Sequence, residues 1–406
     1  MARLMLLPLE LVDMILAWAR LEPQKVTADS RTLAACSRVC KAWKMPTQAL
    51  LFRDIPISLG HRRRSQLVRS LSQRPELGRH IRSFGIEITS PPAPWGRDPP
   101  QNESSERFRQ MVADFITILS HAPNLVRLTI DIDGEFDCAD VSKLVSIHLR
   151  HLHTLNWEGR PSSFVLYLLL ALWPSIRYLR IDNLYFDPPP EDQRPASLRS
   201  LCVRDELSEG FMTWLIPTGD EQPLRELHFE CGLLSSRALK DVQAHAPTLH
   251  VLTVDKIPPQ SLLDALTVLN EFAFCELPSA PVHFPRTVQR VRYHSKGPPW
   301  PRLQPLDPVA PHPKGTRDEG GDSRSMYETG YLTTALKDLP NLALVSATRQ
   351  APEEVLASLE KFCQETNVEF AVYDRTAHYS VSAFLLRWCR SDQQPYIVLI
   401  YSPGTV

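Results

Sequence analysis

Cys36 and Cys40 are the first residues along the chain whose type and spacing could serve chemistry. If one helix carries both, a spacing of four places the two thiols on the same side, where they could ligate one metal ion. Structural zinc is usually held by four ligands, and no nearby cluster of His or Cys supplies the others. Free cysteine is among the residues most often buried, so we expect the pair to pack as small apolar side chains in a helical interface.

Motifs for catalysis and nucleotide binding are missing from the sequence. It contains no phosphate-binding loop, no dinucleotide-binding glycine pattern, no H-E-x-x-H and no G-x-S-x-G. The 13 histidines are scattered, so no catalytic base can be named. The chain is therefore predicted not to be an enzyme and to use neither a metal nor a cofactor.

The composition is that of a globular protein with no preference for polyanions. The chain has 406 residues, of which 43% are hydrophobic and 22% charged, and its net charge is -1. That balance favours neither nucleic acid nor an anionic membrane as a partner. The longest apolar run, residues 164–173, is half as long as the roughly 20 residues that a membrane helix needs.

The cysteines and the first residues bear on the compartment. Eight scattered cysteines without a C-x-x-C fit a reducing environment. Glu10 and Asp13 interrupt the apolar N-terminal run, which favours an amphipathic helix over a signal peptide. The predicted location is the cytoplasm, the nucleus or both.

A short apolar phrase recurs from residue 81 onward and predicts the main architecture. In this phrase the first, fourth and sixth residues are apolar, as expected of a strand with one buried face. Apart from two intervals of 44 and 54, successive phrases start 19 to 27 residues apart. The starts are Ile81, Leu125, Leu152, Ile176, Leu198, Leu224, Leu249, Leu269, Val288 and, in a weaker copy, Leu342, with a doubtful one at Val368.

Helical patterns separate these strands, at 106–120, 161–173, 234–245 and 352–362 among others. Each strand and helix can bury its apolar side only by stacking on its neighbours, which predicts a solenoid with a curved parallel sheet on the concave side. The repeats resemble irregular leucine-rich repeats and would occupy residues 59–375, although the asparagine or cysteine usual at the eighth following position is absent.

Pro-rich inserts fill the two long intervals, at about 90–104 and 296–324. Each follows a strand and precedes a helix, so both should leave the same edge of the solenoid. They are either tolerated disordered insertions or flaps over a binding face. Residues 376–406 are predicted to form a cap or a tail.

Three short apolar segments lie in the first 58 residues. A helix should follow Pro8, and Ser30 should cap a second helix on which Leu33, Cys36, Val39, Cys40 and Trp43 share a face. A third apolar group ends at Phe52. So small a unit has a marginal core, which implies a partner.

These residues resemble the F-box, whose pattern is a Leu-Pro opening, a Val-Cys-x-x-Trp helix and a bulky apolar pair. The resemblance implies a three-helix F-box at 1–58 that docks on a Skp-type adaptor bound to a cullin scaffold. The adaptor-binding residues would be Leu7, Pro8, Leu11, Ile15, Leu33, Val39, Trp43, Leu51 and Phe52.

The resulting fold class is α/β, with an N-terminal three-helix F-box followed by a leucine-rich-repeat solenoid. The function that the resemblance implies is substrate recognition in a Skp/cullin/F-box ubiquitin ligase, in which the repeats hold a protein substrate. The alternative is a scaffold whose F-box assembles something other than a ligase. An enzyme hidden in the solenoid is the third and weakest hypothesis.

One column of the predicted sheet is rich in acidic residues. In each phrase, the residue six positions after the first apolar residue should point out of the concave face. In the first seven phrases this residue is acidic, except for Arg204. The column is either an ordinary solvated strand end or a groove for a cationic substrate, with a basic patch at its end. The predicted substrate-binding residues are Glu87, Asp131, Glu158, Asp182, Glu230, Asp255, Arg290 and Arg292.

Overall fold

The computed structural model of the chain describes its repeats and most of the N-terminal helices. The described residues are 11–12, 14–16, 30–56, 61–89, 101–133, 138–159, 163–182, 198–204, 214–215, 223–229, 236–294, 321–348 and 351–373. Most of each Pro-rich insert and all of 376–406 lie outside these ranges.

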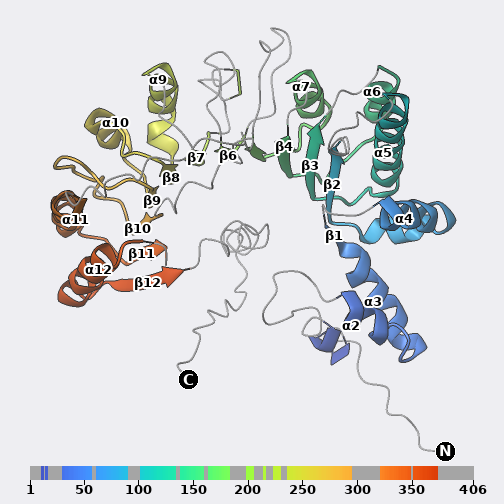
Figure 1. The fold of residues 1–406 in the computed structure, drawn as a ribbon, viewed down its shortest axis with the longest axis horizontal. Coiled ribbons are helices and arrows are strands. Elements are labelled where there is room, and N and C mark those ends of the chain that lie inside the picture. Colours follow the sequence, from blue (N-terminus) through green and yellow to red (C-terminus); the bar gives the residue numbers. More distant parts are fainter. Residues whose placement is uncertain are drawn as a thin grey trace, which may run out of the picture.

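The described residues form one curved parallel sheet with helices on its outer side (Figure 1). Its twelve strands lie in the order of the sequence, so each strand pairs with the one before and the one after. This order confirms the predicted solenoid. The strands are β1 Asp54–Ile55, β2 Ser83–Thr89, β3 Arg127–Asp133, β4 Thr154–Gly159, β5 Tyr178–Ile181, β6 Ser200–Val203, β7 Glu226–Phe229, β8 Val251–Val254, β9 Glu271–Phe274, β10 Arg290–Tyr293, β11 Leu344–Thr348 and β12 Glu369–Tyr373.

The recurring phrase fixes where the strands begin. From β2 to β11, each strand starts two residues after the first apolar residue of its phrase. The doubtful copy at Val368 is also a strand, but it is shifted by one residue, because Phe370 lies opposite the inward Val345. The shift follows Asn367, which ends the preceding helix in the left-handed conformation with φ 56°.

Helices cover the convex side of the sheet (Figure 1). The four predicted helical segments are confirmed as α5, α7, α9 and α12, with ends that differ by a few residues. Both α5 and α11 begin inside the predicted inserts. Beyond the N-terminal region, the helices are α4 His61–Gln73, α5 Gln101–His121, α6 Cys138–Val145, α7 Ser163–Leu172, α9 Ser236–His245, α10 Gln260–Ala265, α11 Gly321–Lys337 and α12 Glu353–Thr366, with the 3-10 turns η1 Pro75–His80 and η2 Ala246–Thr248.

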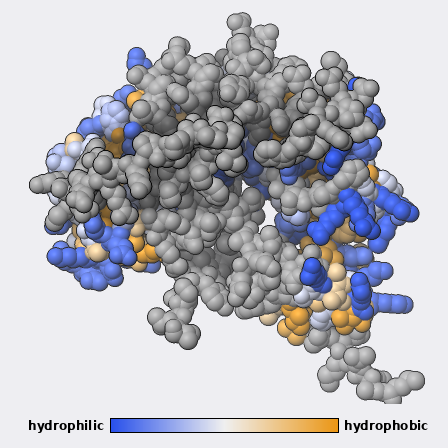
Figure 2. Space-filling view, in the orientation of Figure 1, coloured by the Kyte–Doolittle hydropathy of each residue, from blue (hydrophilic) through white to orange (hydrophobic). Residues whose placement is uncertain are grey.

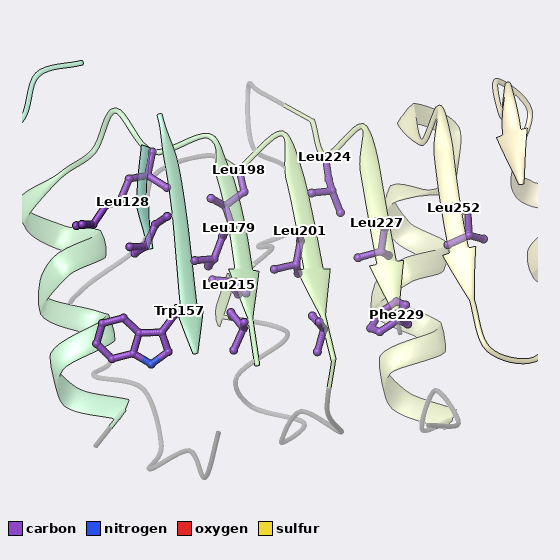
Figure 3. Packing of buried hydrophobic residues seen from close by; sticks show 14 of the residues in the cluster. Leu128, Trp157, Leu179, Leu198, Leu201, Leu215, Leu224, Leu227, Phe229 and Leu252 are labelled. Atoms are coloured by element: carbon purple, nitrogen blue, oxygen red, sulfur yellow. The ribbon is translucent and has the colours of Figure 1, made fainter. Parts of the chain in front are cut away.

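Apolar side chains between the sheet and the helices form one continuous core. Figure 3 shows inward side chains of successive strands stacked in rows, among them Leu179, Leu201, Leu227 and Leu252. All four are at most 2% exposed. Each inward residue therefore contacts its equivalents in the neighbouring repeats, as a solenoid requires.

Polar residues just before the strands join one repeat to the next. Asn124 donates its side-chain amide to the carbonyl of Arg79 at 2.9 Å, and Ser175 donates its hydroxyl to the carbonyl of Leu152 at 2.8 Å. The Thr248 hydroxyl lies 2.9 Å from the carbonyl of Leu224. These side chains satisfy carbonyl groups of the preceding repeat.

A buried ion pair joins the first two helices of the solenoid. Arg64 Nε lies 3.1 Å from Asp114 Oδ2, and both side chains are at most 5% exposed. Gln110 donates to the other oxygen of Asp114 at 2.9 Å. Arg64 is the last residue of the basic run HRRR at the start of α4, yet it is buried, because its side chain reaches across to α5.

Three helical pieces form the N-terminal helical unit, which comprises residues 11–12 and 14–16, α2 Ser30–Cys36 and α3 Lys41–Arg53. Their small core consists of Val12, Leu16 and Leu33, with Trp43 and Leu51 among the side chains packed against it.

The second helix of this unit is shorter than predicted. The expected single helix from Ser30 to Trp43 is wrong, because α2 ends at Cys36 and Cys40 is extended. The Ser37 hydroxyl donates to the carbonyl of Ala34 at 2.7 Å, and three-residue backbone turns follow. Serine side chains that bond nearby carbonyls in this way compete with helix continuation.

No linker separates the N-terminal helical unit from the sheet. Helix α3 ends at Arg53 and β1 starts at Asp54, whose strand pairs with β2. Phe52 packs against the solenoid core, and Ile55 belongs to that core. The predicted boundary at residue 58 therefore falls after the first strand of the sheet.

We predict that Ser175→Ala lowers the free energy of unfolding by about 1 kcal/mol, because the carbonyl of Leu152 loses its side-chain donor. Chemical denaturation measures the change. Ser120→Ala is the control, since the exposed Ser120 bonds only within α5, to the carbonyl of Thr117. Equal effects of the two substitutions would show that the bond between repeats adds nothing.

We predict that Arg64→Met lowers the free energy of unfolding by about 3 kcal/mol, because it strands the buried carboxylate of Asp114. The double variant Arg64→Met with Asp114→Leu should recover most of that loss, since no buried charge remains. Chemical denaturation of the wild type, the two single variants and the double variant gives the coupling energy between Arg64 and Asp114. A double variant whose loss of stability equals the sum of the losses in the two single variants would contradict the pairing.

Candidate functional site

The N-terminal helical unit carries most of the exposed large apolar side chains of the described residues. Seven such residues are exposed, and five of them belong to this unit. Figure 2 shows hydrophobic atoms gathered at the lower right, where Figure 1 places α2 and α3. We call these five the apolar patch: Leu11 at 42% exposed, Met14 at 57%, Ile15 at 42%, Val39 at 65% and Met45 at 54%.

Packing explains why these residues face outward. Val12, Leu16 and Leu33 occupy the inward positions of the described part of the unit. Val39 lies in the turn between α2 and α3, after the helix has ended. An apolar surface of this kind on a short helical unit is typical of an interaction site.

The predicted adaptor-binding residues that the structure describes divide into three groups. Leu11, Ile15 and Val39 belong to the apolar patch, whereas Leu33 is fully buried and holds the helices together. Trp43, Leu51 and Phe52 are partly buried, the last against the solenoid core. Leu7 and Pro8 lie outside the described residues.

Met14 and Met45 belong to the patch although the motif did not point to them. Methionine adapts its shape to a partner more readily than branched residues do. Their exposure follows from how the helical pieces pack, which a spacing rule does not reveal.

The concave face begins with three carboxylates in register. The sheet pairs Glu87 with Asp131, and Asp131 with Glu158, on adjacent strands. Strands in a sheet lie about 4.8 Å apart, so the three acidic residues are near neighbours, as the sequence predicted. Glu87 is exposed, and the other two are partly buried.

Further along the same column the charges are compensated. Arg204 donates to Asp182 at 2.9 Å, and Arg180 lies 3.8 Å from the same oxygen. Asp182 is 8% exposed and Asp255 is 3% exposed. The prediction that Asp182 and Asp255 point into solvent as part of the acidic row is therefore wrong, and Glu230 lies outside the described residues.

The predicted basic patch is also partly compensated. Arg292 lies 3.2 Å from Glu271, which is nearly buried, whereas Arg290 is exposed. Sequence analysis missed Arg127, a buried cation on the concave side of β3. Burial lowers the pKa of Arg127 to about 10, so it still carries its charge at neutral pH.

Cys36 and Cys40 have different surroundings. Cys36 packs against the small core of the N-terminal helical unit, as predicted. Cys40 is exposed at the start of α3, so the prediction that both thiols are packed is wrong for it. Within the described ranges, no group of three or more His, Cys, Asp or Glu could hold a metal ion.

The described helices also bear on membrane insertion. No helix among them is both long and apolar enough to cross a bilayer.

We predict that iodoacetamide labels Cys40 much faster than Cys363 in the folded protein. Cys363 is 2% exposed, and burial raises the pKa of its thiol to about 11. A raised pKa reduces the reactive thiolate fraction at about pH 8. Site-resolved mass spectrometry gives both rates, with the denatured protein as the control; equal rates before denaturation would contradict the burial of Cys363.

Comparisons with known proteins add little to these surfaces. No protein-family model and no curated protein matches the chain. Among solved structures, an internalin from Listeria monocytogenes is similar at 15% identity, with 74% of this chain and 69% of that chain covered. Its TM-score is 0.27, a likeness from which nothing is inferred for this chain.

Proposed function

We propose that this chain is a protein-binding solenoid that acts as the substrate-recognition subunit of a Skp/cullin/F-box ubiquitin ligase. The apolar patch carries the proposal, because it places five exposed apolar side chains at one end of the sheet. The patch would dock on a Skp-type adaptor held by a cullin scaffold, in the cytoplasm, the nucleus or both. The solenoid would hold the protein substrate near the ubiquitin-loaded enzyme.

Burial of the apolar patch on an adaptor would supply free energy for forming the complex. Covering apolar surface stabilises a complex by roughly 25 cal/mol per Å² before the costs of association are subtracted. In the part of the unit that the structure describes, the core buries three apolar residues fully, so a partner that covers the patch would also stabilise the fold. This double gain favours a docking unit over a self-contained domain.

Under this proposal the chain contributes no catalytic group to ubiquitin transfer. Its contribution is proximity, which raises the effective concentration of the substrate at the transferring enzyme. It needs no metal and no cofactor for that role.

Substrate contacts are proposed on the accessible part of the concave face. Glu87, Asp131 and Glu158 form the aligned acidic group there, and Arg290 is exposed at the other end. Asp182, Asp255 and Arg292 would orient neighbouring charges rather than present free ones.

A non-ligase scaffold built on the same two surfaces is the alternative. Docking on the adaptor is common to both functions, so it does not separate them. Copurification of the cullin with the adaptor supports the ligase, and an adaptor complex that never contains a cullin supports the scaffold.

We predict that Leu11→Asp with Ile15→Asp abolishes capture of the Skp-type adaptor, because two charges would have to be buried in the interface. Capture by the purified chain is measured with recombinant adaptor, and thermal unfolding confirms that the solenoid is intact. Leu33→Asp is unsuitable, since it would disrupt the unit's core.

Val145→Asp is the matched control, since Val145 is 47% exposed but lies on α6, outside the patch. It should leave capture unchanged. Adaptor capture that survives the double substitution would overturn the F-box assignment.

A further inference from the structure

One edge of the sheet carries a row of arginine and histidine side chains that the proposed function does not use. The residue just after the first apolar residue of each phrase sits where the strand begins. From β4 to β8 this position is occupied in every repeat by arginine or histidine. We call these five the basic rim: His153, Arg177, Arg199, Arg225 and His250.

Backbone hydrogen bonds fix the spacing along the basic rim. The carbonyl of Arg177 accepts the N–H of Arg199 at 2.8 Å, and the carbonyl of Arg199 accepts the N–H of Arg225 at 2.8 Å. His250 continues the series with the same bond to Arg225. The three arginines therefore start about 4.8 Å apart, on adjacent strands of a rigid sheet.

Two of the three arginines in the rim are available to a ligand. Arg199 and Arg225 are exposed, and their side chains form no ion pair or hydrogen bond with any part of the chain that the structure describes. Arg177 differs, because it donates to the carbonyl of Pro174 at 3.1 Å, just beyond the end of α7. Arg177 is thus engaged by the carbonyl of Pro174, whereas Arg199 and Arg225 are not engaged in this way.

Among the described residues, the turns just before these strands add no acidic side chain, and Glu226 follows Arg225 as the first residue of β7. The described turns that lead into these strands, at 146–153, 173–177, 198–199, 223–225 and 246–250, contain no Asp or Glu. The first of them adds the exposed cation Arg150. The opposite ends of strands β2 to β4 carry Glu87, Asp131 and Glu158, so the acidic row and the basic rim overlap at β4, which is basic where it begins and acidic where it ends.

We infer that the basic rim binds an acidic segment of a partner protein, with its carboxylates paired to Arg199 and Arg225. Arginine presents a planar fork of donors that matches a carboxylate with two hydrogen bonds. The rim from β4 to β8 is roughly 19 Å long, a length that about six extended residues cover.

A protein segment fits this surface better than a nucleic acid does. The chain has a net charge of -1, and the acidic strand ends would repel a polyanion that extends beyond the rim. A short acidic peptide can stay on the rim. This inference rests on the proposed role of the solenoid in holding a protein substrate, and not on the adaptor.

A labelled oligo-glutamate peptide of about eight residues tests the rim with the full-length protein. Fluorescence anisotropy should show binding that weakens as salt is added. Arg199→Glu with Arg225→Glu should weaken it on the order of tenfold or more, through lost pairs and added repulsion. The control Arg62→Glu with Arg69→Glu changes the net charge equally at two exposed arginines of α4 and should leave the affinity nearly unchanged.

Three results would overturn the inference: no binding of the peptide, equal loss in both double variants, or tighter binding of an oligothymidylate of similar charge. Equal loss would mean that net charge alone matters, and the third result would indicate a nucleic-acid surface. Adaptor capture, measured on the same variants, should not change. A failure at the rim with intact capture, or the reverse, separates this inference from the proposed function.

Discussion

The structure depends on one constraint: no repeat can bury its apolar side alone. A strand of four residues with one helix leaves inward leucines such as Leu201 open unless another strand lies on each side. Stacking the repeats along one direction buries these side chains. Every strand from β2 to β11 lies between the strand of the preceding repeat and the strand of the following repeat. The parallel order, the single core and the positions of the helices all follow from it.

This constraint explains why so much of the sheet could be predicted from the sequence. An apolar phrase with a fixed internal spacing determines both the strand and its inward face, so ten strand starts could be located to the residue. Prediction was less accurate where the local pattern was weak, as at Val368, where the left-handed Asn367 shifts the strand by one position. Short helices such as α6 and α10 carry too few turns for a periodic signal.

Contacts between distant residues account for what the sequence could not reveal. Arg64 and Asp114 are 50 positions apart, and nothing near either residue indicates an ion pair. The compensation of Asp182 by Arg204 depends on the register of β5 and β6. In the N-terminal helical unit, a single serine hydroxyl helps to end α2, and Val39 lies exposed in the turn that follows. The candidate site thus combines a patch that the motif partly anticipated with charges that only the fold brings together.

The continuity of α3 and β1 has a mechanical consequence. With no residue between Arg53 and Asp54 to act as a hinge, and with Phe52 and Ile55 held by the solenoid core, the helical unit cannot swing freely. Whatever it holds is kept at a set angle to the sheet. Each added repeat moves the far end of the arc by about 4.8 Å along a fixed curve. The number of repeats therefore sets the distance between the two ends of the sheet. Partners bound at these ends would be held at a separation that the chain length determines, and not one that flexibility adjusts.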